Sequence, residues 1–269
     1  METIQGNAVV RLVEWEVSAS ARACEPAVWN GLVLVPTKLG QVVPLNPVSG
    51  AAEVHPFQPE LAFGEPIDWA TPVSVAGTPP SAILSDRQFR LFRLGLVDEP
   101  EPHLAELDKI TLSQPVRGPV AVAGLMLVGV GQQEGRDVLH LFQLPEMAPQ
   151  DPIPLSGELT LPPREVEGTI YCATPQEGLL AIRDDFQIAW ALDIEGKTPV
   201  AGPVAFGGQL TIAFAEGEAW LIDAASGKRI ARHDVGEPLA EGLSSIDGQL
   251  WAHGPDGTLH RVSWEETKP

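Results

Sequence analysis

The spacing of glycine and proline is the feature that most constrains how this chain folds. The triplet Gly-Gln-Leu occurs at 208–210 and again at 248–250, and a second glycine follows nine residues after each first one, at Gly217 and Gly257. Similar pairs run back through the chain, which marks it as a series of structural repeats. The first glycines of the six repeats are Gly31, Gly77, Gly124, Gly168, Gly208 and Gly248.

A proline five residues before the first glycine fixes the phase of the repeat. Short apolar segments lie between and after the glycines, bounded by Gly, Pro, Asp and Asn, which predicts β-strands joined by tight turns. A recurring unit of about 40–45 residues built this way is typical of a β-propeller blade. The units start near Pro26, Pro72, Pro119, Pro163, Pro203 and, where leucine replaces proline, Leu243.

One segment also has a helical pattern. Residues 179–195 contain no glycine or proline, and their apolar residues recur at three- and four-residue spacing. The neighbouring repeat has a turn at the same phase, at 223–228, and Arg183-Asp184-Asp185 fills that position here. The repeat therefore favours strand, turn, strand over a helix.

A longer pattern recurs after the second glycine. Gly217 is followed by Ala219-Trp220-Leu221-Ile222-Asp223 and then by Ser226-Gly227-Lys228, and 44–50 is a second copy with Asn46 in place of the aspartate. With Trp190 as the closing tryptophan, this unit resembles the pyrroloquinoline-quinone-type propeller repeat. The resemblance covers essentially the whole chain and implies a β-propeller, although it says little about chemistry because one fold hosts many functions.

The phase of the repeats also predicts how the ring closes. The segment 9–17 contains Trp15, equivalent to the closing tryptophan, whereas the last repeat ends near Trp264, one strand short. Pairing the two would complete the last blade and remove two exposed sheet edges. We expect an all-β chain with one domain over residues 1–269, a β-propeller of six four-stranded blades closed by its N-terminal strand.

The charge balance excludes one class of partner. The chain carries 17 Lys and Arg against 36 Asp and Glu, a formal net charge of −19, and such a surface repels polyanions. We therefore expect no nucleic acid partner. No apolar run reaches the roughly 18 residues of a membrane span, so we expect no membrane insertion. The compartment would be periplasmic or extracytoplasmic if a signal segment precedes residue 1, and cytoplasmic otherwise.

Quinone-dependent dehydrogenases belong to the family that the repeat resembles. The resemblance implies that such an enzyme needs a calcium ion held by carboxylate and amide groups, an aspartate base and usually a vicinal cysteine pair. Cys24 and Cys172 are far apart, and no repeat carries a clustered Glu/Asn/Asp set. Two buried thiols are the simplest interpretation of the cysteines, with one long-range disulfide as the alternative. We expect no quinone cofactor.

Other catalytic arrangements are also incomplete. His253 and His260 flank a turn, but a zinc site needs three or four converging ligands and no third is placed by the spacing. Ser244 and Asp247 lie near His253, yet no Gly-x-Ser-x-Gly elbow frames a serine nucleophile. We therefore predict no catalytic residue, no cofactor and no metal, and lean against an enzyme.

The most unusual stretch is 97–109, in the link between the second and third repeats. Five carboxylates and two prolines fall within it. A run of like charge is usually a solvated loop; the functional interpretation is an acidic docking surface for a basic partner, which the prolines stiffen. The carboxylates are Asp98, Glu99, Glu101, Glu106 and Asp108.

Two tryptophans near strand starts offer a second kind of site. Trp29 and Trp69 would contact a ligand if they faced the central channel, and would pack between blades if they did not. Packing is favoured, because large aromatic residues dominate core energetics.

Two functions remain in view. The first is a protein-interaction scaffold without catalytic activity, similar to the propeller of outer-membrane assembly lipoproteins or to the propeller modules of larger bacterial proteins. The second is a small-molecule or carbohydrate site in the central channel, possibly hydrolytic. Since no convergent chemical constellation is present, the sequence favours the scaffold.

Overall fold

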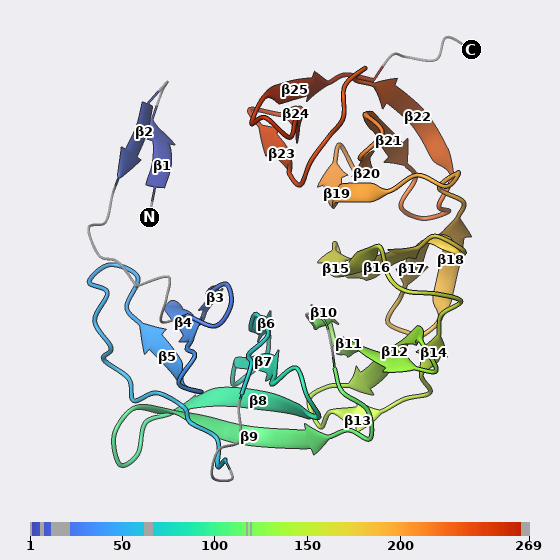
Figure 1. Ribbon diagram of the computed structural model, residues 1–269. Coiled ribbons are helices and arrows are strands. Elements are labelled where there is room, and N and C mark those ends of the chain that lie inside the picture. The colour runs from blue at the N-terminus through green and yellow to red at the C-terminus, as the bar shows by residue number, and fades with distance from the viewer. Residues whose placement is uncertain are drawn as a thin grey trace. The chain divides into compact units, whose positions relative to one another are not determined.

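The computed structural model is built from antiparallel β-sheets (Figure 1). The backbone of two short strands is described near the N-terminus, and Trp15 and Pro119 lie outside the described residues. No helix occurs among the described residues, and so none there is long and apolar enough to cross a membrane. The described residues are 2–5, 8–11, 22–61, 67–116, 118 and 120–264.

The chain forms two compact units, residues 1–120 and 121–269. The first unit holds three sheets, in which neighbours along the chain pair in order. Its strands are β1 (Glu2–Gln5) with β2 (Ala8–Arg11); β3 (Ala27–Trp29), β4 (Leu32–Pro36) and β5 (Val42–Leu45); and β6 (Val73–Val75), β7 (Ser81–Ser85), β8 (Arg90–Val97) and β9 (His103–Thr111).

The second unit holds four further sheets, in which neighbouring strands pair in order except that β13 and β14 both pair with β12. They are β10 (Ala121–Ala123), β11 (Met126–Gln133), β12 (Arg136–Gln143), β13 (Ala148–Pro149) and β14 (Ile153–Pro154); β15 (Leu161–Val166), β16 (Thr169–Thr174), β17 (Gly178–Ile182) and β18 (Ile188–Leu192); β19 (Pro199–Phe206), β20 (Gln209–Phe214), β21 (Glu218–Ile222) and β22 (Arg229–Asp234); and β23 (Leu243–Ile246), β24 (Gln249–His253) and β25 (Leu259–Val262).

The sheets from β3 onward follow the sequence repeats one for one. The all-β prediction is confirmed, and three of these sheets have four strands in simple order. Residues 179–195 form β17, a turn closed by the Phe186 N–H on the Arg183 carbonyl (2.9 Å), and β18, so the helical alternative is excluded. The proposed closing strand 9–17 is described only as far as Arg11, where β2 pairs with β1, and its role stays a prediction.

The backbone geometry of the hairpin loops explains why glycine recurs in the repeats. In four repeats the first glycine is the second residue of a two-residue hairpin loop, as in Glu167-Gly168 between β15 and β16, where both φ angles are positive (49° and 81°). Such loops match the twist of the strands they join and need glycine or a tolerant residue. Pro163 and Pro203 lie in β15 and β19, which are edge strands of their sheets. An edge strand has one side without a paired strand, and a proline that faces this side removes no hydrogen bond from the sheet.

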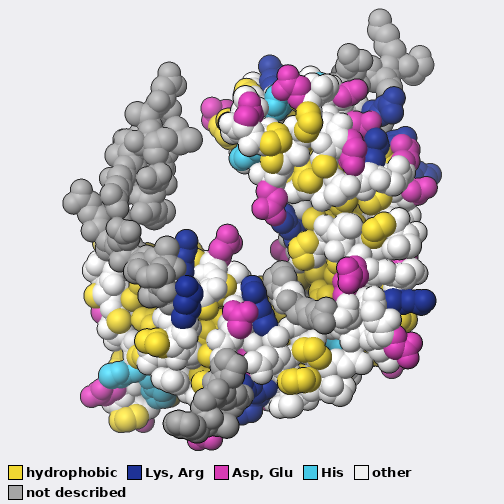
Figure 2. All heavy atoms as spheres, in the orientation of Figure 1, with side chains coloured by type: hydrophobic (Ala, Val, Ile, Leu, Met, Phe, Trp, Pro, Cys, Tyr) yellow, Lys and Arg dark blue, Asp and Glu magenta, His cyan; other side chains and the backbone are white. Residues whose placement is uncertain are grey.

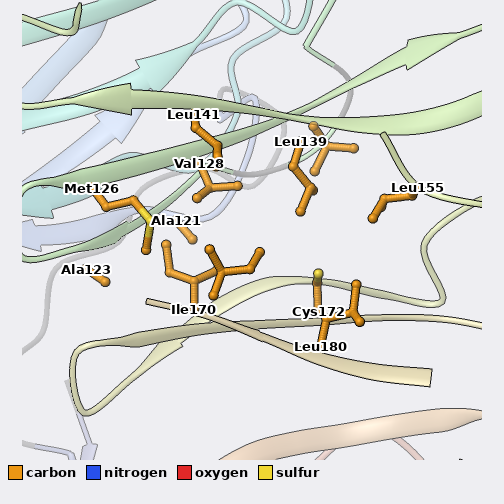
Figure 3. Packing of buried hydrophobic residues seen from close by; sticks show 12 residues of the cluster. Ala121, Ala123, Met126, Val128, Leu139, Leu141, Leu155, Ile170, Cys172 and Leu180 are labelled. Atoms are coloured by element: carbon orange, nitrogen blue, oxygen red, sulfur yellow. The ribbon is translucent and has the colours of Figure 1, made fainter. Parts of the chain in front are cut away.

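The middle strands are buried on both faces. In β16, Ile170 and Cys172 pack against β10–β12, whereas Tyr171 and Ala173 pack against β20 and β21. Figure 3 shows the first of these clusters, with Val128, Leu139 and Leu141 pointing toward Ile170, Cys172 and Leu180 from the opposite sheet. Because alternate residues of a strand point to opposite faces, such strands are apolar throughout.

The closing tryptophan of the repeat has a defined contact. The Trp190 indole on β18 donates its Nε1–H to the Ala224 carbonyl of the next sheet (3.0 Å). Gly227, in the same turn, has φ +71°, and a Cβ added there would lie 2.5 Å from Trp190 Cδ2. The Asp223 carboxylate accepts the Ser226 N–H (2.8 Å) and hydroxyl (2.6 Å), which holds the turn in shape. Glycine at this position lets one blade pack on the next.

We expect Gly227→Ala to destabilise the chain more than Gly236→Ala. Both glycines have a positive φ (+71° and +79°), so alanine carries the same left-handed backbone cost of roughly 1–2 kcal/mol. Only Gly227 faces a ring, and overpacking there adds about 1–3 kcal/mol, whereas nothing lies within 4 Å of the Gly236 position. Urea unfolding of both variants measures the difference; equal losses would show that the Trp190 contact adds nothing.

His140 on β12 is a half-buried base. Burial lowers its pKa below the usual value of 6.5, and its Nε2 has no hydrogen-bond partner among the described residues. His140 therefore takes up a proton less readily in the folded state than in the unfolded chain. The free energy of unfolding is unaffected by His140 above pH 6.5, where the imidazole is neutral in both states, and it decreases as the pH falls below 6.5, because the unfolded chain is protonated first.

We predict that His140→Gln flattens the fall in stability between about pH 7 and pH 5. Glutamine does not titrate, so its contribution stays constant over this range. The measurement is the free energy of unfolding in urea at several pH values for both proteins. Parallel curves would mean that His140 does not carry the proton uptake.

Candidate functional site

The acidic stretch forms a hairpin rather than a link between repeats. Strands β8 and β9 pair up to Val97 and His103, and residues 98–102 form the tip. The expected linker position is therefore wrong: residues 103–111 are the outer strand of the second sheet, because they continue the pairing with β8. Asp98, Glu99 and Glu101 lie at the tip, whereas Glu106 and Asp108 lie on β9.

A segment from the first repeat braces this hairpin. The His55 N–H donates to the Pro102 carbonyl (2.9 Å), and the Leu104 N–H donates to the His55 carbonyl (3.0 Å), which forms a short parallel bridge with β9. These backbone bonds hold His55 beside the tip. His55 is a functional candidate that no sequence pattern marks, since a parallel bridge to His103 on a distant strand leaves no local signal.

Imidazole and carboxylate groups meet at the tip. The His55 Nε2 lies 2.8 Å from the Glu101 Oε2, and the His103 Nδ1–H donates to the Glu101 carbonyl (2.8 Å). The His55 and Glu101 side chains remain 64% and 74% exposed. Figure 2 shows histidine and acidic side chains together at this hairpin, at the lower left.

The tip carries more negative charge than its neighbours neutralise. Asp98 and Glu99 are exposed and have no ion pair among the described residues. On β9 the balance differs, because the Lys109 Nζ lies 3.2 Å from the Glu106 Oε1 and the Lys109 N–H donates to the Asp108 carboxylate (2.8 Å). The carboxylates without an ion pair in the described part of the hairpin are therefore Asp98 and Glu99, whereas Glu101 contacts His55.

An open cleft lies beside the tip. It has a volume of about 440 Å³ and is lined by His55, Pro100, Glu101 and His103. This volume is within the range of pockets that hold small groups. Its lining combines an apolar proline ring, a carboxylate and two imidazoles, a chemistry that suits the aliphatic stem and cationic end of a lysine or arginine side chain.

Trp29 and Trp69 lie in the core of the first unit. They are 1% and 0% exposed, and the Trp69 ring packs edge-on against Phe92 with centroids 5.5 Å apart. The structure thus gives them the packing role rather than an exposed aromatic face. The indole N–H of each has no hydrogen-bond partner among the described residues.

The other side chains considered as catalytic, metal-binding or disulfide-forming residues do not converge into a site. The Ser244 hydroxyl and the His253 Nε2 are 3.4 Å apart, but Asp247 lies in the hairpin turn at the opposite end of β23. No group of three His, Cys, Asp or Glu residues that could hold a metal occurs in the part of the chain that the structure describes. Both cysteines are free thiols; burial raises the pKa of Cys24 to about 11 and that of Cys172 to about 12.

We predict that the triple variant D98N/E99Q/E101Q changes the free energy of unfolding by less than about 1 kcal/mol, since exposed ion pairs contribute little. Asp86 is the matched structural carboxylate. It is fully buried, 2.6 Å from the Arg90 Nε, and accepts the Gln88 and Arg90 N–H groups. Asp86→Asn should cost about 3–5 kcal/mol in the same urea experiment. A large loss in the triple variant would make the tip carboxylates structural.

Comparisons with known proteins establish the fold. No protein-family model and no curated protein matches the chain. Among solved structures, BamB from Moraxella catarrhalis is 18% identical, with a TM-score of 0.57, over 97% of this chain and 74% of that one. BBS1N, solved in complex with ARL6DN, is 13% identical, with a TM-score of 0.61, over 88% and 75%.

A computationally designed protein, Ika8, is 11% identical, with a TM-score of 0.63, over 94% of this chain and 73% of its own. BamB and BBS1N are both β-propellers. At these identities the likeness concerns the fold alone, and the fold is that of a β-propeller.

Proposed function

We propose that this chain is a protein-interaction scaffold without catalytic activity, and that the tip of the β8–β9 hairpin docks a basic segment of a partner protein. The observation that carries the proposal is the exposed carboxylate cluster at 98–101 beside an open cleft, in which Asp98 and Glu99 have no ion pair among the described residues. BBS1N, a propeller of similar fold, was solved in complex with a second protein, ARL6DN.

The chemistry of the tip selects the partner. Asp98 and Glu99 offer carboxylates that no cation of the described chain occupies, so a lysine or arginine gains an ion pair without displacing one. The hairpin is held by backbone bonds from His55, so less conformational freedom is lost on binding. A net charge of −19 adds long-range attraction for a basic surface and disfavours nucleic acid.

We also propose a finer description of the fold, based on the sequence repeats. The chain would be a propeller of six blades built from pyrroloquinoline-quinone-like repeats, in which residues 9–17 complete the last blade beside β25. The turns at 223–228 and 46–50 support a common repeat: the Gly227 N–H donates to the Asp223 carbonyl and the Gly50 N–H to the Asn46 carbonyl, both at 2.8 Å.

The alternative, a ligand site built on Trp29 and Trp69 in the central channel, has less support. Both indoles are enclosed by hydrophobic side chains, including Phe92 and Leu94. A sugar or small aromatic ligand needs an exposed ring face to stack on. The hairpin offers accessible groups instead.

We expect D98N/E99Q/E101Q to weaken binding of a fluorescein-labelled peptide of alternating arginine and alanine by about tenfold, because three accessible charges are lost. Fluorescence anisotropy at low salt measures the dissociation constant. The control E60Q/E146Q/D184N removes three exposed carboxylates elsewhere and has the same net charge.

The control should bind the peptide within about twofold of the wild type, because only the general field changes. Equal weakening in both variants would mean that the peptide senses the overall charge and that the hairpin is not a docking site. A wild-type protein that does not bind the peptide would also contradict the proposal.

A further inference from the structure

The outer strand of the β19–β22 sheet is an open edge. β22 pairs through one side with β21, from Glu218 opposite Asp234 to Ile222 opposite Arg229. Among the described residues no strand pairs with its other side, and Figure 1 shows β22 as the last strand of its sheet. Its outward backbone N–H and C=O groups are therefore available to an added strand.

This edge is basic in an otherwise acidic chain. Lys228, Arg229 and Arg232 fall within five residues and are exposed, although the whole chain has only 17 Lys and Arg. Glu195 pairs with Arg229 (2.7 Å), but neither Lys228 nor Arg232 has an ion pair among the residues that the structure describes. The charges of Lys228 and Arg232 help to lower the pKa values of Asp223 and Glu218, but neither cation is held in a direct ion pair by the described residues.

Side chains of β21 hold the Arg229 side chain of this edge in place. The Arg229 guanidinium lies 4.3 Å from the centroid of the buried Trp220 ring, whose Nε1–H donates to the Glu218 carboxylate (2.9 Å). The Lys197 Nζ also contacts Glu218 (3.0 Å). Burial raises the pKa of Glu218, but the hydrogen bonds from Trp220 and Lys197 outweigh it and lower the pKa overall. Glu218 is thus ionised and already engaged by these two neighbours.

An apolar side chain lies between the cations. Ile230 occupies the β-bulge of β22, where the pairing with β21 shifts register, and it is 44% exposed. Across the bulge, Arg229 and Arg232 lie opposite Ile222 and Trp220, which are two apart on β21 and face the same side. A strand that alternates acidic and apolar residues can therefore place its carboxylates on one face, beside both arginines.

We propose that β22 is a second docking surface, which binds an acidic, extended segment of a partner protein by strand addition. Main-chain hydrogen bonds to the open edge supply affinity, and the cations at 228, 229 and 232 select a carboxylate-rich strand. The same charges disfavour a basic or uncharged strand, so they give specificity as well as attraction. This site is independent of the acidic hairpin, and the chain would present two docking surfaces of opposite charge.

The test uses a labelled peptide of alternating glutamate and valine, titrated with the full-length protein and followed by fluorescence anisotropy. The variant K228E/R232E reverses the two unpaired cations and leaves the Arg229–Trp220 contact intact. It should weaken binding by about tenfold or more. The matched control R136E/R261E reverses two exposed arginines elsewhere in the same unit and should change binding by less than about twofold.

A peptide with proline in place of valine separates strand addition from simple attraction, because proline cannot donate to the backbone ladder. The proposal expects this peptide to bind markedly more weakly than the valine peptide. Equal binding of both peptides, equal effects of both variants, or no binding to the wild type would each overturn it. Self-association in analytical ultracentrifugation that the acidic peptide competes away would also overturn it, because the occupant would then be a second copy.

Discussion

The structure depends on the need of each middle strand to bury two apolar faces at once. Tyr171 and Cys172 are neighbours on β16, yet one packs toward β20 and β21 and the other toward β10–β12. A single sheet cannot satisfy both faces, so a blade is stable only between two others. Glycine at turns such as 227 lets the next sheet approach closely enough for Trp190 to seal the contact.

The residues available for binding partners lie outside the packed middle strands. Outer strands and hairpin tips are free to vary in charge because they contribute little to the blade-to-blade contacts. The β8–β9 tip carries Asp98 and Glu99 without an ion pair among the described residues, and β22 carries Lys228 and Arg232 in the same condition on an open edge. The contrast with Asp86, a buried carboxylate bonded to Arg90 and to backbone N–H groups, separates charge that supports the fold from charge available to partners.

The sequence predicted the sheets well because their turns impose strict backbone requirements. Positive φ angles at Glu167-Gly168 and similar loops can be recognised from glycine alone, and the strands between them follow from apolar runs. It also predicted the turn at 183–185 against a helical pattern, because the repeat phase carries information that local periodicity lacks.

The candidate site was only partly predictable. The carboxylates of 98–108 were recognised, but their division between a tip and strand β9 depends on pairing with β8, which the acidic composition hides. His55 joins the site through a long-range bridge, and the burial of Trp29 and Trp69 depends on which way each side chain faces at a strand start. Lys228, Arg229 and Arg232 stand close together in the sequence, but nothing in the sequence shows that they lie on an open sheet edge.

Hydrogen–deuterium exchange with a basic peptide bound tests the central claim most directly. The account predicts slower exchange at the hairpin tip, residues 98–104, and at His55, whose backbone bonds brace it, with little change over β10–β21. Protection spread evenly over the acidic surface, or confined to another blade, would contradict the assignment of the docking site to the β8–β9 hairpin.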